Sequence, residues 1–241
     1  MQHEPSISLV IPVCNEEENL AALHEEIVAA MDRIGRAWEA VYVDDGSTDA
    51  GLALLERLAS EDGRVRVVAF EVNCGQSAAF WAGFEHARAP VVVTMDADRQ
   101  NDPADIPPLL AAYDAGHEMV VGWRKSRRDT LVKRLSSRLA NAIRNRLTAE
   151  TIHDTGCSLK VMDRGMLLRL PRFKGMHRFL PTLMRMQGAR VAEVPVHHRA
   201  RAAGVSKYGT LDRALAGVHD LLGVRWLLRR HFHCRIRKCG G

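Results

Sequence analysis

The chain has 241 residues, of which 46% are hydrophobic, with a formal net charge of +5. A chain of this length buries one substantial core, so we expect one α/β domain with an appendage. No window approaches the roughly 20 apolar residues that span a bilayer, so we expect that the protein is not integral to a membrane. We also expect no signal peptide and, because five scattered cysteines form no CxxC pair, reduced thiols in the cytoplasm.

The charge is unevenly distributed. From Arg199 to Gly241 there are ten Lys or Arg against two Asp or Glu, whereas the preceding part is mildly acidic. We therefore divide the chain into a main domain, residues 1–208, and a basic segment, residues 209–241. Such a segment suits an anionic lipid surface or nucleic acid, although a solvated basic tail without a partner has the same composition.

Short apolar runs alternate with amphipathic stretches through the first half. The runs rich in Val and Ile predict strands at Ser6–Val13, Glu39–Val43, Arg64–Phe70, Pro90–Met95 and Glu118–Gly122. The stretches between them predict helices at Glu16–Ile34, Asp49–Ala59, Gln76–Ala87 and Pro103–Ala115, the last capped by Asp102. This βα series predicts a mostly parallel sheet with helices on both faces.

The second half is more basic. Residues 124–146 hold nine Lys or Arg and one acid, with apolar residues at helical spacing. They predict a basic amphipathic helix beside the expected ligand site, or a helix with an ordinary solvated cationic face. Further strands are expected at Ser158–Met162 and Arg190–His197. A basic amphipathic helix is expected from Gly209 onward.

Two acidic clusters follow predicted strands. Asp44 and Asp45 follow the second strand, and Asp96-Ala97-Asp98 follows the fourth. Ligands of parallel sheets bind outside the carboxyl ends of the strands, so both clusters should open onto one rim. The first strand-to-helix turn is acidic and lacks GxGxxG, and no GxxxxGK[ST] occurs, which argues against a dinucleotide dehydrogenase and a P-loop enzyme.

Asp96 and Asp98 are one residue apart at a strand end. Both carboxylates can therefore address one ion as hard oxygen ligands, which suit Mg²⁺ or Mn²⁺. A ligand diphosphate would complete the coordination shell. Taken alone, the triplet also fits a turn or a helix-capping pair.

Seven segments in a fixed order carry a resemblance to a known family. They are VIPVCNEEENL, VDDGSTD, NCGQSAAF, VVTMDADRQNDP, GWRKSRRD, IHDTGCSLKVMDR and AAGVSKYG, from residue 10 to residue 209. Together they resemble glycosyltransferase family 2, especially its polyprenyl-phosphate sugar transferases. The resemblance implies the GT-A fold and metal-dependent, inverting transfer of a hexose from a UDP- or GDP-sugar to a polyprenyl or dolichyl phosphate.

The resemblance also implies a nucleotide-sugar site. Its implied donor-binding residues are Pro12, Val13, Glu16, Asp45, Asp96, Ala97 and Lys207. Asp98 and Gln100 would ligate the metal directly, with Asp96 beside the ribose or the metal-bound diphosphate. Alternatively, Glu16 is a helix-start carboxylate and Asp45 forms an Asx turn before Gly46. Arg99 departs from the family, which usually has an apolar residue there.

The phosphate groups would meet arginines. The resemblance places Arg124 and Arg127 on phosphate oxygens, a role that suits the planar guanidinium. Asp154 would lie near the acceptor, or cap a turn instead. The segment with Ser206 and Lys207, preceded by Arg199 and Arg201, resembles a loop that closes over the diphosphate.

A lipid phosphate acceptor needs no strong base, because its second pKa is about 6. A saccharide hydroxyl acceptor would need one, and Asp154 is then the candidate base. A nucleic-acid-binding module is the remote alternative, opposed by few aromatic residues and the lack of RNA-binding motifs, so we expect no nucleic acid partner. We expect peripheral binding at the cytoplasmic face of a membrane, through an anionic surface or an integral partner.

Overall fold

The computed structural model describes residues 4–125, 152–199 and 210–232, with the backbone alone for residues 210–218. Seven strands form one sheet in the order β3-β2-β1-β4-β6-β5-β7. Their bounds are β1 Ile7–Val13, β2 Trp38–Asp44, β3 Val65–Ala69, β4 Val91–Thr94, β5 Met119–Trp123, β6 Lys160–Asp163 and β7 Val191–Pro195. The five strands expected in the first half and both later ones are confirmed.

The four helices expected in the first half are confirmed as well. The first four are α1 Glu17–Ile34, α2 Gly51–Glu61, α3 Gln76–His86 and α4 Ile106–Asp114. A 3-10 turn, η1 Pro103–Asp105, precedes α4, and the side chain of Asp102 caps it by accepting a hydrogen bond from the Ala104 amide at 3.0 Å. The second half adds α6 Arg164–Leu167, η2 Met176–Arg178, α7 Leu180–Met186 and α8 Thr210–Arg230.

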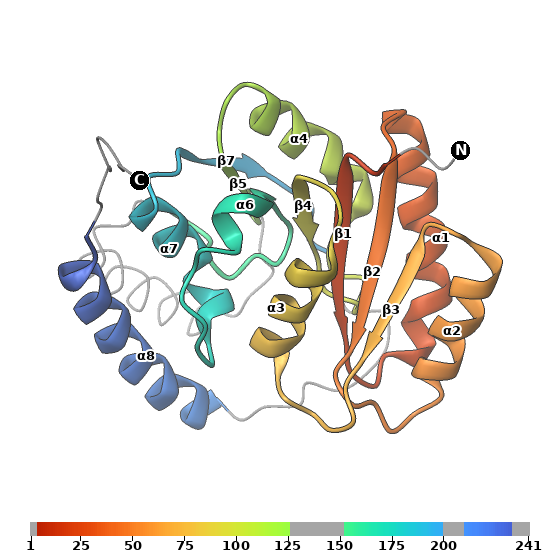
Figure 1. Cartoon of the computed structure of the whole chain (residues 1–241), viewed down its shortest axis with the longest axis horizontal. Coiled ribbons are helices and arrows are strands. Elements are labelled where there is room, and N and C mark those ends of the chain that lie inside the picture. The colour runs from red at the N-terminus through yellow and green to blue at the C-terminus, as the bar shows by residue number, and fades with distance from the viewer. Residues whose placement is uncertain (1–3, 126–151, 200–209, 233–241) are drawn as a thin grey trace, which may run out of the picture.

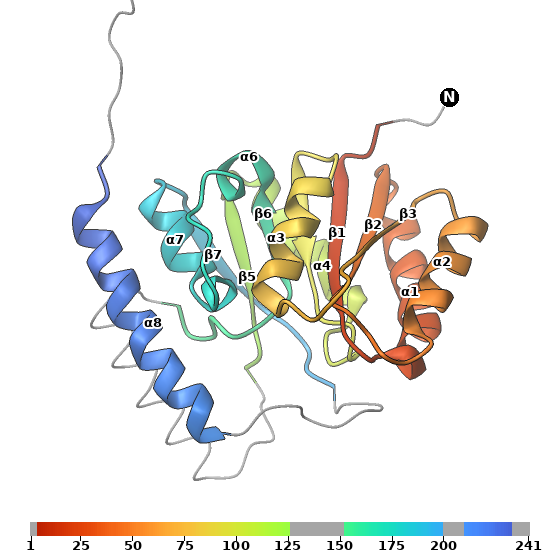
Figure 2. The ribbon, with the colours of Figure 1, turned by 60° about the horizontal axis from the view of Figure 1, so that its bottom comes forward.

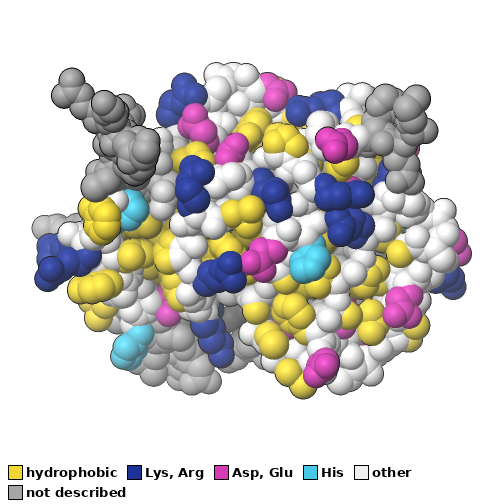
Figure 3. Space-filling view, viewed as in Figure 1, with side chains coloured by type: hydrophobic (Ala, Val, Ile, Leu, Met, Phe, Trp, Pro, Cys, Tyr) yellow, Lys and Arg dark blue, Asp and Glu magenta, His cyan; other side chains and the backbone are white. Residues whose placement is uncertain are grey.

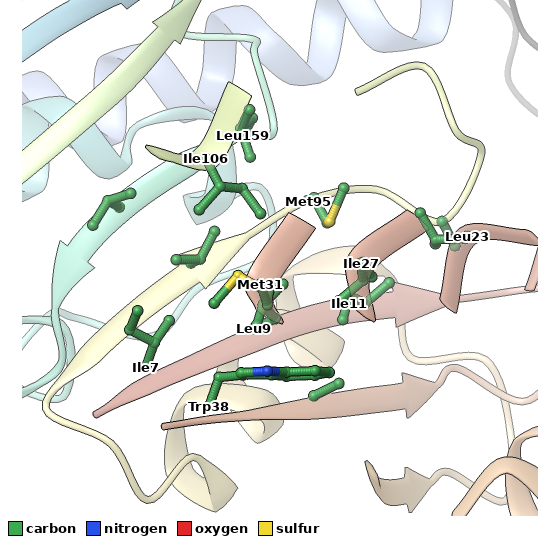
Figure 4. Packing of buried hydrophobic residues seen from close by; sticks show 14 of the residues in the cluster. Ile7, Leu9, Ile11, Leu23, Ile27, Met31, Trp38, Met95, Ile106 and Leu159 are labelled. Carbon is green, nitrogen blue, oxygen red and sulfur yellow. The ribbon is translucent and has the colours of Figure 1, made fainter. Parts of the chain in front are cut away.

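Helices cover both faces of the sheet (Figure 1). Alternate residues of β1 point to opposite sides: Ile7, Leu9 and Ile11 join a core with α1 and α4, whereas Val10 joins a second core with α3 and α7. Figure 4 shows Leu23, Ile27 and Met31 of α1 packed over the strands in the first core. The two-sided burial explains why the strands read as continuous apolar runs.

One strand runs against the others. β6 pairs antiparallel with β4 and with β5, whereas the remaining pairs are parallel. The carboxyl ends of β1, β2, β4 and β5 therefore share an edge with the amino end of β6. This reversal brings residues 154–160 next to the acidic cluster that follows β4.

Helix α8 lies at one end of the molecule, beyond α7 (Figures 1 and 2). Leu221 and Val224 are buried in the second core, so this helix packs on the main domain. Within the described residues, no helix is both long enough and apolar enough to cross a bilayer. The basic helix expected at residues 124–146 lies outside the described residues from position 126 onward.

Helix α3 approaches β1 closely at Gly83, where an added Cβ would lie 2.2 Å from Val10 Cγ1. We predict that Gly83→Ala destabilises the protein by about 1–3 kcal/mol, the usual cost of overpacking. The matched control is Gly223→Ala in α8, where nothing lies within 4 Å of the added methyl. It should stabilise by about 0.5–1 kcal/mol through helix propensity. Urea unfolding measures both, and equal effects would contradict the close contact.

Candidate functional site

The first two loops at the carboxyl edge hold each other in place. Asn15 Oδ1 accepts a hydrogen bond from the Thr48 amide at 2.7 Å, and the Asn15 amide donates to Ser47 Oγ at 3.0 Å. The Glu17 amide donates to Asp49 Oδ2 at 3.0 Å. These contacts join the NEEEN turn to the DGSTD turn across the ends of β1 and β2.

The predicted donor residues at the end of β1 line this part of the edge. Pro12 is half-buried, whereas Val13 is buried and its carbonyl accepts the Asp45 amide at 2.8 Å. The Glu16 carboxylate accepts a hydrogen bond from Asn19 Nδ2 at 2.7 Å, one turn into α1. Contact between these residues and a nucleotide stays a prediction.

Asp45 shapes the loop before α3. Its carboxylate accepts hydrogen bonds from the amides of Cys74 and Gly75, at 2.7 and 3.0 Å, and from Asn73 Nδ2 at 3.0 Å. Burial nevertheless raises the pKa of Asp45. The alternative role of Asp45 in an Asx turn is not seen, because the Ser47 amide, two residues after Asp45, donates to Asp44 Oδ2 at 3.1 Å instead.

The Asp96–Gln100 loop follows β4. Asp98 is buried, and its Oδ1 accepts the Gln100 amide at 3.1 Å. Arg99 between them has a φ of 58°, the left-handed conformation that side chains other than Gly, Asn and Asp rarely adopt. The turn thus holds the Asp98 carboxylate beside the backbone of Gln100, the third expected ligand, while Ala97 is buried in the first core.

Asp96 lies beside the start of α3. Its Oδ1 accepts a hydrogen bond from Gln76 Nε2 at 2.8 Å. Burial, followed by the charge of Asp98, raises the pKa of Asp96. Among the described residues, no three His, Cys, Asp or Glu side chains gather to hold an ion on their own. Metal binding by Asp96, Asp98 and Gln100 therefore stays a prediction.

Arg99 and Arg199 share a carboxylate of α1. Arg99 pairs with Glu26 Oε1, and Arg199 contacts Glu26 Oε2 at 2.7 Å and Asp102 Oδ2 at 2.6 Å. The Arg199 amide also donates to the Gln100 carbonyl at 3.0 Å. Both guanidinium groups brace the Asp96–Gln100 loop, so the structure gives Arg199 carboxylate partners where the sequence predicted a phosphate.

Arg124 is committed to Asp154. Arg124 Nε and Nη2 donate to the two carboxylate oxygens at 2.7 and 2.8 Å, and the side chains are 12% and 9% exposed. Asp154 therefore positions Arg124 at the end of β5. The roles predicted for Arg124 on phosphate and for Asp154 near the acceptor stay predictions. Arg127, Arg201, Ser206 and Lys207 lie outside the described residues.

A cavity of about 220 Å³ opens beside Asp96. Lys160 lines it although it is buried, and donates to the Cys157 carbonyl. Burial lowers the pKa of this lysine. His177 and Arg178 of η2 lie on the same wall. The site therefore combines carboxylates at the strand ends with cationic groups around a polar cavity.

A sequence profile described as Glycosyl transferase family 2 matches residues 8–170, which include both acidic clusters. The chain belongs to glycosyltransferase family 2. Two curated relatives of this glycosyltransferase support the family assignment. It is 39% identical to dodecaprenyl-phosphate galacturonate synthase from Rhizobium johnstonii over 228 residues, covering 92% of this chain and 67% of the relative.

A second curated relative is undecaprenyl-phosphate 4-deoxy-4-formamido-L-arabinose transferase from Salmonella dublin. The two are 36% identical over 217 residues, 90% of this chain and 66% of that protein. The glycosyltransferase thus spans about two thirds of the length of these relatives. Both relatives are named as transferases or synthases of polyprenyl-phosphate sugars.

Solved structures show the GT-A fold. The glycosyltransferase superposes on glucosyl-3-phosphoglycerate synthase from Mycobacterium tuberculosis, in complex with Mn²⁺, UDP and phosphoglyceric acid, with a TM-score of 0.68. Identity is 24%, and the match covers 93% of this chain and 78% of that one. The expected fold class, a mostly parallel sheet between helices, is confirmed.

Sequence reasoning missed several residues of this edge. Gln76 falls within the NCGQSAAF segment that carried the resemblance, and its spacing from Asp96 gives no sign of their contact. In the sequence, nothing distinguishes Lys160 from an ordinary strand residue. His177 and Arg178 lie in a segment without a distinctive pattern, and only the packing of η2 on α3 brings them to the cavity.

The buried Arg124–Asp154 pair gives a stability test. We predict that Asp154→Ala destabilises the glycosyltransferase by about 3–5 kcal/mol, because it leaves the Arg124 charge buried without a partner. Glu85→Ala breaks the exposed pair with Arg172, at 2.8 Å, and should cost about 0–1 kcal/mol. Chemical denaturation compares the two variants. A loss at Asp154 no larger than that at Glu85 would contradict the buried pair.

Proposed function

We propose that the protein transfers a hexose from a UDP- or GDP-sugar to a polyprenyl phosphate, with inversion at the anomeric carbon. The observation that carries the proposal is the pair of adjacent carboxylates, Asp96 and Asp98, at the carboxyl end of β4. The names of the curated relatives support the acceptor class. The donor lies along the edge from Pro12 to Asp98, with the nucleoside beside the interlocked loops.

The residues present fit a divalent cation. Asp96, Asp98 and Gln100 supply oxygen donors, the chemistry that Mg²⁺ and Mn²⁺ prefer. Burial, followed by the charge of Asp98, raises the pKa of Asp96, and a cation beside it would stabilise the charged carboxylate. When bound, the ion supplies charge neutralisation for the departing nucleoside diphosphate. Solved structures of the same fold contain Mn²⁺ or Mg²⁺ together with UDP.

The acceptor phosphate attacks without a dedicated base. At neutral pH a lipid phosphate with a second pKa of about 6 is mostly dianionic. A bond forms between its oxygen and the anomeric carbon while the bond from that carbon to the diphosphate oxygen breaks. The protein's part is to position both substrates and to stabilise charge on the leaving group.

A saccharide hydroxyl is the alternative acceptor, and it requires a base. Asp154 was the candidate, but its two oxygens hold Arg124 at 2.7 and 2.8 Å. Its neighbours Thr155 and Gly156 line the cavity beside Asp96. The bidentate pairing of Asp154 with Arg124 favours a structural role and hence the phosphate acceptor.

A transfer assay tests the donor site and the acceptor class together. With a radiolabelled UDP- or GDP-sugar, Mn²⁺ and undecaprenyl phosphate, we predict label in the lipid extract and none with a saccharide acceptor. Asp98→Ala should abolish transfer, at least about 100-fold given the several kcal/mol that such an ion supplies. EDTA should do the same to the wild type.

The control is Asp114→Ala, which removes an exposed carboxylate at the last residue of α4, paired with Arg36 at 3.2 Å. It should transfer at the wild-type rate. Lipid labelling by Asp98→Ala at that rate, or full activity in EDTA, would overturn the metal assignment. Label in a saccharide product alone would favour the hydroxyl acceptor.

The location we propose is the cytoplasmic face of a membrane, with α8 in contact with anionic lipid. One face of α8 packs on the domain through Leu221 and Val224, and another exposes Leu222 and Trp226, at 56% and 63%. Basic and apolar side chains lie side by side on this flank of the molecule (Figure 3). Exposed aromatic and aliphatic groups beside arginines are typical of interfacial helices.

Vesicle binding tests this surface. We predict that the protein co-sediments with anionic vesicles, that binding weakens with salt, and that Leu222→Ser with Trp226→Ser reduces it at least tenfold. Val72→Ser is the control, because Val72 is 66% exposed on the loop after β3. Equal loss in control and double variant would overturn the surface. Absence of wild-type binding to any vesicle would favour an integral partner.

A further inference from the structure

The cavity beside Asp96 contains cationic groups that the proposed donor site does not use. Asp96, Lys160, His177 and Arg178 line it. Lys160 is 4% exposed and committed to the Cys157 carbonyl, whereas the Arg178 side chain is 39% exposed. Arg178 therefore carries the positive charge that a ligand in the cavity can reach.

The segment that carries Arg178 is fixed to the donor site. Ser77 Oγ accepts the Gly175 amide at 2.9 Å and lies 2.7 Å from His177 Nδ1. The preceding residue of α3, Gln76, holds Asp96. The first turn of α3 thus fixes η2 relative to Asp96, and Arg178 and Asp96 line the same cavity.

The present partner of Arg178 is a loose one. Arg178 Nη1 lies 3.7 Å from Asp220 Oδ2 of α8, in contrast to the 2.7 Å contact between Arg124 and Asp154. Asp220 sits closely against the loop, because a Cβ at Gly175 would meet its Oδ2 at 2.4 Å. A partly exposed ion pair of this length contributes little stability and is readily exchanged for a stronger anion.

We propose that Arg178 binds the phosphate monoester of the acceptor, and that Asp220 is its counter-ion until the acceptor arrives. The inference rests on the proposed function and adds a binding residue to it. A phosphate offers a guanidinium two parallel hydrogen bonds, which the 3.7 Å contact with Asp220 lacks. The lipid phosphate then meets the anomeric carbon at the Asp96 side of the cavity, while its chain leaves past α8.

The test uses short soluble probes. Farnesyl phosphate and farnesol differ only by the phosphate, and calorimetric titration in the presence of UDP and Mn²⁺ gives their affinities. We predict that Arg178→Gln weakens farnesyl phosphate at least tenfold and leaves farnesol and UDP unchanged. Arg178→Lys should retain part of the affinity, because it keeps the charge without the planar fork.

Two further variants sharpen the result. Arg172→Gln removes a neighbouring surface arginine paired with Glu85 and should bind farnesyl phosphate like the wild type. Asp220→Asn removes the competing anion and should tighten farnesyl phosphate about two- to fivefold, the range of an exposed ion pair. Weaker or unchanged binding by Asp220→Asn would overturn the role given to Asp220. Thermal melting and UDP affinity show whether each variant is folded.

Kinetics separate this inference from the proposed function. With undecaprenyl phosphate, Arg178→Gln should raise the KM for the lipid at least tenfold and leave the KM for the donor unchanged. If the wild type binds farnesyl phosphate no better than farnesol, the proposed function fails. If it does prefer farnesyl phosphate and Arg178→Gln keeps that preference, only this inference fails.

A carboxylate on the donor sugar is the other anion that Arg178 fits. Arg178→Gln would then weaken UDP-galacturonate, but neither UDP-galactose nor farnesyl phosphate. That pattern would overturn the acceptor assignment.

Discussion

Four carboxylates, Asp44, Asp45, Asp96 and Asp98, crowd the carboxyl ends of two strands, and the repulsion among them is the constraint around which the site is built. Like charges at short range in a partly buried edge are costly unless each has a donor or a cation. The Asp45 carboxylate accepts hydrogen bonds from the amides of Cys74 and Gly75, and Asp44 Oδ2 accepts one from the Ser47 amide. We propose that a divalent cation with a diphosphate compensates the charges of Asp96 and Asp98.

The first turn of α3 provides hydrogen-bond donors to two of these carboxylates. Its amino end is the positive pole of the helix, where carboxylates are stabilised. Gly75 donates to Asp45, Gln76 to Asp96, and Ser77 accepts from Gly175. Three consecutive residues therefore connect the ends of β2 and β4 to η2. The same turn holds η2, whose residues His177 and Arg178 line the cavity together with Asp96.

Much of the fold follows from local pattern. Apolar runs and amphipathic stretches predict the strands and helices of the first half within about two residues, because strands buried on both faces and helices packed on them leave strong periodicities. The rim position of Asp45, Asp96 and Asp98 follows from the parallel order. The antiparallel direction of β6 has no local signal, although it brings Lys160 and Asp154 to the edge.

The contacts that the sequence misses join distant positions. The sequence predicts that Arg199 binds phosphate. In the structure, however, Arg199 pairs with Glu26, which is 173 residues away in the sequence. Asp45 precedes a glycine as an Asx-turn residue does, yet its carboxylate accepts hydrogen bonds from residues 73–75, and the Ser47 amide donates to Asp44. The role proposed for Arg178 follows from its ion pair with Asp220 and from the cavity that it shares with Asp96, and both partners lie on other elements. Tertiary partners, which pattern does not encode, decide these roles.

The most direct measurement of the central claim is a crystal structure with UDP and Mn²⁺, with diffraction recorded at the manganese absorption edge. We expect one anomalous peak between the carboxylate of Asp98, the side-chain oxygen of Gln100 and the UDP diphosphate, with the uridine beside Pro12 and Val13. A peak elsewhere, or UDP bound away from the carboxyl ends of β1 and β4, would contradict it.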